Sequence, residues 1–91
     1  MTQTAPITLT QYGRMAEKHW REFRPKMVQE MEATGTLQER LYEAQEATRK
    51  EMDDLTEKLI QQQYSPQQAE TAAWEVVRQR YILLPPEDQE V

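Results

Sequence analysis

The chain has 91 residues, carries a formal net charge of −5 and contains no cysteine. A chain of this length forms one small domain, since it buries only about 60–65% of its extended surface. The lack of cysteine excludes disulfides and thiolate metal sites. No apolar run approaches the roughly eighteen residues that span a membrane, and the N-terminal residues lack the features of a signal peptide, so we expect a cytoplasmic protein without membrane contact.

Charge is distributed unevenly along the chain. Between Thr10 and Lys26 there are five basic residues and two acidic ones, whereas residues 27–60 hold nine acidic and four basic residues and residues 61–91 hold five and two. The chain therefore has a basic head and an acidic body. Its overall acidity argues against non-specific binding to nucleic acid, which depends on neutralising several phosphates at once.

The first predicted elements are a polar leader over residues 1–8, which we expect to be flexible, and a helix over residues 9–23. Apolar residues recur in this helix at steps of three and four, which is the helical spacing. Thr8 or Thr10 can cap its start, and Thr8 with Gln11 would form a capping box.

Glycine and proline residues divide the next part of the chain. Gly13 lies inside the first helix, where it costs up to about 1 kcal/mol relative to alanine; either another backbone approaches closely there or the weakness is tolerated. Pro25 suits the first position of a second helix, which ends at Gly35 in a left-handed conformation. Only Thr36 separates this stop from the next start, so the second and third helices must fold back on each other or cross steeply.

The strongest pattern predicts one long amphipathic helix over residues 36–63. The segment contains neither proline nor glycine, and Thr36 with Glu39 is spaced as a capping box. At 1.5 Å per residue the helix would be roughly 40 Å long, so flanking segments or a second copy of the chain must cover its apolar face. That face comprises Leu37, Leu41, Ala44, Thr48, Met52, Leu55 and Leu59.

A fourth helix is predicted to begin at Ser65, with Pro66 at its first position and Gln68 at its third. Its small alanines let it lie close to the long helix, residues 81–84 are apolar enough to pack back on the body, and residues 85–91 form an acidic tail that we expect to be disordered. The predicted fold is thus all-α, with three to four helices packed around the long one in a single domain over residues 9–84. Its core is small, and dimerisation or a partner would complete it.

The residue inventory does not favour an enzyme. One histidine, no cysteine and no glycine-rich phosphate loop leave nucleophilic triads, zinc sites and P-loops without their parts, so we expect no catalytic residue, cofactor or metal. His19, beside an aromatic residue, fits packing better than catalysis. The carboxylates of the long helix (Glu43, Glu46, Asp54 and Glu57) fit a solvated face paired with Lys50 and Lys58.

Partner binding is the function that the surface residues favour. Basic residues recur every three or four positions along the first helix, and a tryptophan between them could act as an anchor. The residues predicted to contact a partner are Arg14, Lys18, Trp20, Arg21 and Arg24. Three alternatives remain: the row binds DNA, the row offsets the acidic long helix of its own chain, or the carboxylates of the long helix mimic nucleic acid and occupy a basic site on a host or defence enzyme.

Several short motifs resemble the TnpV family of small transposon-encoded proteins. They lie within about residues 9–48 and comprise Tyr12-Gly13-Arg14-Met15, Arg24-Pro25, Gly35-x-Leu37, Leu41 and Glu43. The resemblance implies an accessory protein of a mobile element without known catalytic residues. Together with the surface pattern, it predicts a small non-enzymatic binding or regulatory protein that acts through a helical surface, either on another protein or as a homodimer.

Overall fold

A computed structural model describes residues 9–87 of the chain. Within that range the chain forms four helices and no strand, which confirms the all-α class: α1 (Gln11–Phe23), α2 (Pro25–Thr34), α3 (Leu37–Gln61) and α4 (Pro66–Tyr81). The predicted leader over residues 1–8, with the capping box at Thr8, lies outside the described residues. No helix in the described range is both long enough and apolar enough to cross a membrane.

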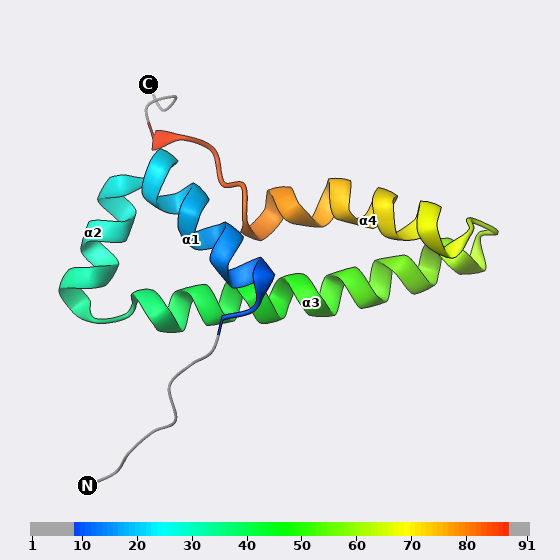
Figure 1. The fold of residues 1–91 in the computed structure, drawn as a ribbon, viewed down its shortest axis with the longest axis horizontal. Helices are drawn as coiled ribbons and strands as arrows, with labels where there is room; N and C mark the ends of the chain where they lie inside the picture. The colour runs from blue at the N-terminus through cyan, green and yellow to red at the C-terminus, as the bar shows by residue number, and fades with distance from the viewer. Residues whose placement is uncertain (1–8, 88–91) are drawn as a thin grey trace, which may run out of the picture.

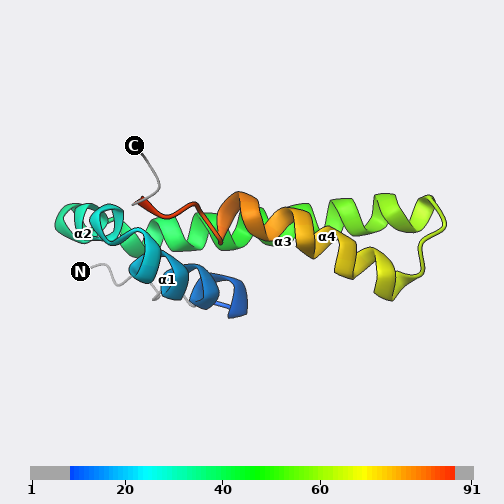
Figure 2. The same cartoon turned by 90° about the horizontal axis from the view of Figure 1, so that it is seen from above.

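The long helix α3 is the spine on which the other helices pack, as predicted. α2 stands steeply across one end of α3, α1 crosses its N-terminal half, and α4 returns alongside its C-terminal half (Figure 1). Seen from above, α1 and the beginning of α4 project from the same side of α3 (Figure 2). One face of the molecule is therefore built from α1, α3 and the first turns of α4.

The apolar stripe predicted for the long helix forms the core. Leu37, Leu41, Ala44, Thr48 and Met52 are buried, while Leu55 and Leu59 are half-buried. One cluster of buried residues gathers at the crossing of α1, α2 and α3, and a second lies between α3 and α4. The rings of Tyr12, Trp74 and Tyr81 contact both clusters, so they join the two halves into one core.

The structure confirms the helix start that was predicted at Ser65 for α4. The Ser65 Oγ accepts a hydrogen bond from the Gln68 N–H at 3.1 Å, and the Gln68 Oε1 accepts one from the Ser65 N–H at 3.3 Å, which completes a capping box. Ala69 and Ala73 have no exposed surface. Their small side chains bring the backbone of α4 close to α3, as expected.

The capping box predicted at the start of α3 is not formed, because Thr36 belongs to the end of α2. Gly35 has φ 72°, its N–H donates to the carbonyl of Glu32, and the Thr36 N–H donates to the carbonyl of Met31, which is a Schellman arrangement. Closing this motif gives Thr36 φ −110° and ψ 2°, outside the extended region in which a threonine caps a following helix.

Gly13 is explained by close approach, although by side chains and not by another backbone. A Cβ atom at this position would lie 2.5 Å from the Gln45 Oε1 and 2.9 Å from the Leu9 Cδ2. Gln45 is itself buried on α3, and its Oε1 accepts a hydrogen bond from the Thr10 N–H. Glycine thus lets a buried amide of α3 reach the N-terminus of α1. Thr10 caps that helix by position only, without a side-chain hydrogen bond.

The chain after α4 returns to the junction of α1 and α2. Ile82 is fully buried, as the apolar run predicted, and the Glu87 carboxylate accepts hydrogen bonds from the N–H groups of Lys26 and Met27 at 3.2 and 3.0 Å. These N–H groups lie in the first turn of α2, where a helix lacks internal acceptors. Glu87, which was predicted to belong to the disordered tail, thus contacts the start of α2, whereas residues 88–91 lie outside the described residues.

Candidate functional site

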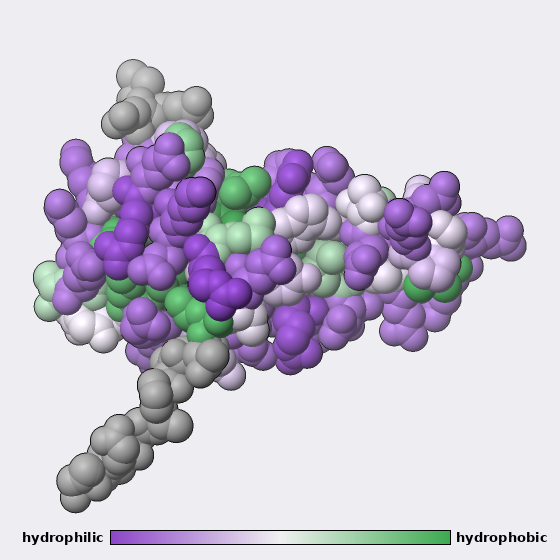
Figure 3. All heavy atoms as spheres, viewed as in Figure 1, coloured by the Kyte–Doolittle hydropathy of each residue, from purple (hydrophilic) through white to green (hydrophobic). Residues whose placement is uncertain are grey.

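Arg14, Lys18 and Arg21 lie in a row on the exposed side of α1, which we call the basic row. Residues on the opposite side of the same helix, Ala16 and Trp20, are buried against the body. Hydrophilic side chains cover α1 on the face of the molecule to which it contributes (Figure 3). The amphipathic pattern of α1 thus fixes the basic row toward the outside.

The three members of the basic row differ in their partners. The Arg21 guanidinium pairs with the Glu17 carboxylate at 2.9 Å and with the Glu32 carboxylate at 3.2 Å, and these hydrogen bonds raise the pKa of Arg21 further above its ordinary value. The Arg14 Nη1 donates to the carbonyl of Leu9 at 2.8 Å. Neither Arg14 nor Lys18 forms an ion pair with a residue in the described range, so their charges are not offset by a carboxylate in contact.

Arg21 thus pairs with an acidic neighbour of its own chain, but not in the way that the alternative of a row offsetting the long helix predicted. That neighbour, Glu32, lies on α2 and not on the acidic long helix. The connection is possible because the chain turns at Arg24, whose φ of −134° and ψ of 56° interrupt the helix between Phe23 and Pro25 and set α2 beside α1. Arg21 therefore serves the contact between α1 and α2.

Arg24 lies apart from the basic row and holds the C-terminal segment. It is half-buried, and its Nη1 donates to the carbonyl of Pro85 at 2.7 Å. His19 does the same one turn earlier: its Nε2 donates to the carbonyl of Leu84 at 2.9 Å, and its ring packs on Phe23 with centroids 4.5 Å apart. The predicted packing role of His19 fits this placement.

Trp20 lies in the core, with 4% of its surface exposed. Its Nε1 donates a hydrogen bond to the carbonyl of Ile82 at 3.1 Å. The structure thus makes Trp20 the anchor of α1 on its own chain and does not present the ring at the surface. Contact of the other predicted residues with a partner stays a prediction.

A second feature of the same face, which the sequence did not indicate, is a groove between α1, α3 and α4. Two adjoining hollows of about 360 Å³ and about 280 Å³ share Tyr12, Met52 and Glu70 as lining residues. The rings of Tyr12 and Trp74 stack in it with centroids 5.5 Å apart and planes at 22°. We call this feature the acidic–aromatic groove and define it by Tyr12, Met52, Asp53, Glu57, Glu70 and Trp74.

Carboxylates dominate the charge of the acidic–aromatic groove. Glu57 and Glu70 form no ion pair with any described residue, and Asp53 has only a 3.6 Å contact with the exposed Arg49 guanidinium. No lysine or arginine of the described chain lines either hollow. Burial and then the nearby carboxylates of Glu70 and Asp53 raise the pKa of the Tyr12 hydroxyl above its ordinary value.

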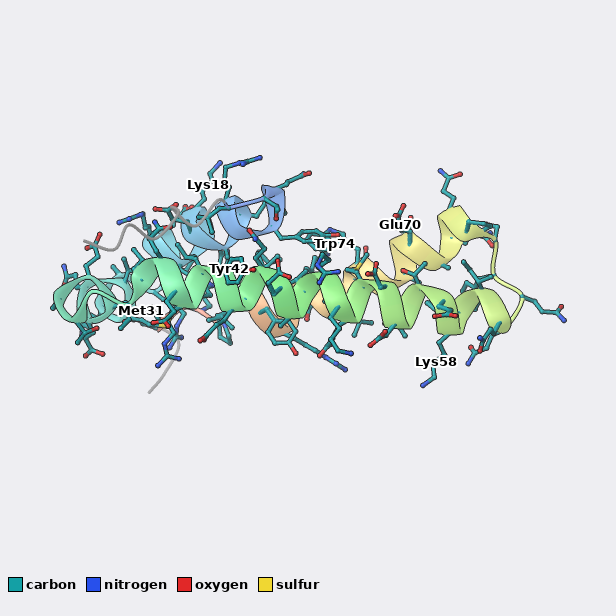
Figure 4. The ribbon with its side chains drawn as sticks, turned by 90° about the horizontal axis from the view of Figure 1, so that it is seen from below. Lys18, Met31, Tyr42, Lys58, Glu70 and Trp74 are labelled. Atoms are coloured by element: carbon teal, nitrogen blue, oxygen red, sulfur yellow. The ribbon has the colours of Figure 1, made fainter. Side chains whose placement is uncertain are left out.

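The groove could not be read from the sequence because its two rings are far apart along the chain. Trp74 one turn after Glu70 was the only local signal. Lys18, Glu70 and Trp74 project from the same side of α3, whereas Lys58 points to the opposite side (Figure 4). The basic row and the acidic–aromatic groove thus lie next to each other on one face.

The remaining carboxylates of α3 are mostly paired within the chain. Lys50 pairs with Asp54 at 3.0 Å, as predicted for a solvated face, and Arg49 pairs with Glu46 at 3.1 Å. The pairing predicted for Lys58 is not formed, since this lysine has no ion pair in the part of the chain that the structure describes. No group of three or more histidine, aspartate or glutamate residues within residues 9–87 is placed to hold a metal ion.

Comparison with known proteins identifies the family. The family model described as transposon-encoded protein TnpV matches residues 1–82, which is most of the chain and extends well past the motifs noted in the sequence. The chain therefore belongs to the TnpV family. No curated protein and no solved structure matches it.

Proposed function

We propose that this member of the TnpV family is a non-enzymatic accessory protein of a transposon that binds another protein through α1. The observation that carries the proposal is the exposure of Arg14 and Lys18 on a helix anchored by the buried Trp20, with no carboxylate of the described chain in contact with either. Charged side chains that no carboxylate contacts are available to pair with an acidic protein surface, where they steer association and fix its orientation.

A protein partner fits this face better than a nucleic acid. Duplex DNA carries negative charge along its whole length, so Glu57 and Glu70 beside the basic row would repel it. A folded protein can match both signs with a surface of the opposite pattern. The acidic-decoy alternative is weaker, because pairing of Asp54 with Lys50 and of Glu46 with Arg49 interrupts the array of negative charge that such a decoy needs.

Photo-crosslinking in cells that carry the transposon tests the proposal. A photoreactive amino acid replaces Gln11, which is exposed one turn before Arg14. We expect a crosslinked product that Lys18→Glu reduces at least about tenfold, since reversing the charge turns an attraction into a repulsion. Lys58→Glu is the matched control, because Lys58 is also an exposed lysine without an ion pair among the described residues and points the opposite way.

A second experiment tests whether the same face binds DNA. Fluorescence anisotropy of labelled duplex DNA, titrated at low salt, gives electrostatic binding its best chance. We expect no saturable binding. Saturable binding with a steep salt dependence, abolished by Arg14→Glu combined with Arg21→Glu while the helical circular dichroism is kept, would replace the proposal with a DNA-binding function.

A further inference from the structure

We infer that the surface met by the basic row is the acidic–aromatic groove of a second copy of this chain, so that two copies form an antiparallel dimer with two-fold symmetry. The inference rests on the proposed function and names its partner. In each copy, Arg14 and Lys18 would contact the groove of the other copy near Glu57 and Glu70.

Charge complementarity is the first argument. The basic row offers two cations, Arg14 and Lys18, that no described carboxylate contacts, and the groove offers two carboxylates, Glu57 and Glu70, that no described cation contacts. The other charged residues of these two surfaces already have partners within their own copy. Arg21 is paired with Glu17 and Glu32, and Asp53 has a long contact with Arg49. The two sets of unpaired charge are thus equal in number and opposite in sign.

The chemistry of the groove floor also fits a cationic side chain. The stacked rings of Tyr12 and Trp74 provide aromatic faces, and tryptophan is the best aromatic partner for an arginine or lysine cation. Trp74 is half-exposed, and Ile60, which lines the smaller hollow, is 42% exposed. A long basic side chain can lay its methylene groups on this apolar surface while its charged end reaches the carboxylates.

Placement on one face makes the pairing reciprocal. Because Lys18 projects from the same side of α3 as Glu70 and Trp74, a second copy can be laid face to face with the first and reversed end for end (Figure 4). A two-fold axis in the plane between them then brings each basic row over the other copy's groove. Such an isologous contact is closed, so it forms a dimer and does not propagate into a fibre.

Sedimentation velocity with charge-reversed variants of the full chain tests the inference. One variant carries Arg14→Glu with Lys18→Glu, and the other carries Glu57→Lys with Glu70→Lys. In a dimer of this geometry each variant alone places like charges together at both contacts, whereas a mixture of the two restores opposite charges at both. Helical circular dichroism of each variant shows whether it is folded.

We expect the unmodified chain to dimerise at about 50 mM salt, with a Kd that rises at least about tenfold at about 500 mM salt because the exposed pairs are screened. Each double variant is expected to be monomeric, and their equimolar mixture to form a heterodimer. Lys58→Glu should leave dimerisation unchanged.

Three results would overturn the dimer: a monomeric unmodified chain at low salt, dimerisation that either double variant leaves intact, or a mixture of folded variants that stays monomeric. These failures differ from failure of the proposed function. A monomeric chain whose crosslink to a different protein depends on Lys18 and not on Lys58 would reject the second copy as the partner and keep protein binding through α1.

Discussion

Trp20 and Trp74 show how the same residue type serves two purposes in a small helical protein. Trp20 is buried and donates to the carbonyl of Ile82, which fastens the chain after α4 to α1. Trp74 is half-exposed and stacks on Tyr12 in the groove. The position of each tryptophan within its own helix does not reveal its role. Only the tertiary fold distinguishes the structural ring from the surface ring.

Replacing each tryptophan with phenylalanine should separate these roles. Trp20→Phe removes the donor to a buried carbonyl, so we expect a loss of about 1–3 kcal/mol in the free energy of unfolding, measured with urea. Trp74→Phe keeps an aromatic ring for stacking and leaves no buried polar group unpaired, so its loss should be clearly smaller. Equal losses would contradict the assignment of Trp20 as the anchor of α1.

Gly13 allows a second residue-scale prediction. Alanine is the better helix former, yet a methyl group at this position would press on Gln45 and Leu9, so Gly13→Ala should destabilise the protein by about 1–3 kcal/mol. Part of this loss should disappear in a Gln45→Ala background, which a double-mutant cycle measures as a coupling energy. Gly35→Ala, strained by its positive φ with open space around it, should show no such coupling. A stabilising Gly13→Ala would disprove the close approach.

At the scale of the helix, the starts of α3 and α4 contrast because the residues before them differ in conformation. Ser65 is extended, with ψ 158°, and forms its capping box, whereas Thr36 closes the end of α2 and forms no side-chain cap. We therefore expect Ser65→Ala to lower the free energy of unfolding by about 1 kcal/mol and Thr36→Ala to lower it by much less. Urea denaturation of both variants makes the comparison; similar losses would mean that Thr36 caps α3 after all.

The contact between α3 and α4 should depend on pH through Glu51. The Tyr81 hydroxyl, followed by the Arg80 guanidinium, donates to this carboxylate and holds the pKa of Glu51 below its ordinary value of 4.5. Because the folded-state pKa is the lower one, the stabilisation is fully present above the ordinary value and is lost as pH falls through the folded value. The hydrogen bond to Glu51 also raises the pKa of Tyr81 above 10.0, so its contribution is lost as pH rises beyond that value.

Urea denaturation between about pH 3 and pH 7 measures the acid side of this dependence. Glu51→Gln keeps an acceptor for the Tyr81 hydroxyl and removes the charge. Its free energy of unfolding should therefore fall less steeply below the ordinary carboxylate pKa than that of the unmodified chain. An unchanged slope would show that Glu51 does not contribute to the pH dependence.

At the scale of the whole molecule, the sequence predicted what local signals control. Pro25, Gly35 and the Ser65-Pro66 pair act within one helical turn, and the apolar spacing of α3 reports its own buried face, so four helices and the central position of α3 could be foreseen. The start of α3 at Thr36 is confirmed, but its predicted capping box was wrong because Thr36 also closes the end of α2. The local sequence alone does not decide whether Thr36 closes α2 or caps α3 with its side chain.

The candidate site was only half predictable for a related reason. Exposure of the basic row follows from the amphipathic pattern of α1, whereas pairing of Arg21 with Glu32 and of Arg24 with Pro85 depends on how the chain turns. The stack of Tyr12 on Trp74 joins residues that lie far apart in the sequence. Periodicity places a residue on a face of its own helix and leaves open which helix it meets.

The proposed function depends most on the binding of a protein by α1 through Lys18 and Arg14. The most direct measurement is the yield of the photo-crosslink from position 11 in cells that carry the transposon, compared between Lys18→Glu and Lys58→Glu. We predict that the crosslink is lost with Lys18→Glu and kept with Lys58→Glu. Equal yields from the two variants would contradict the proposed function, since both reverse one exposed lysine and differ in the face on which it lies.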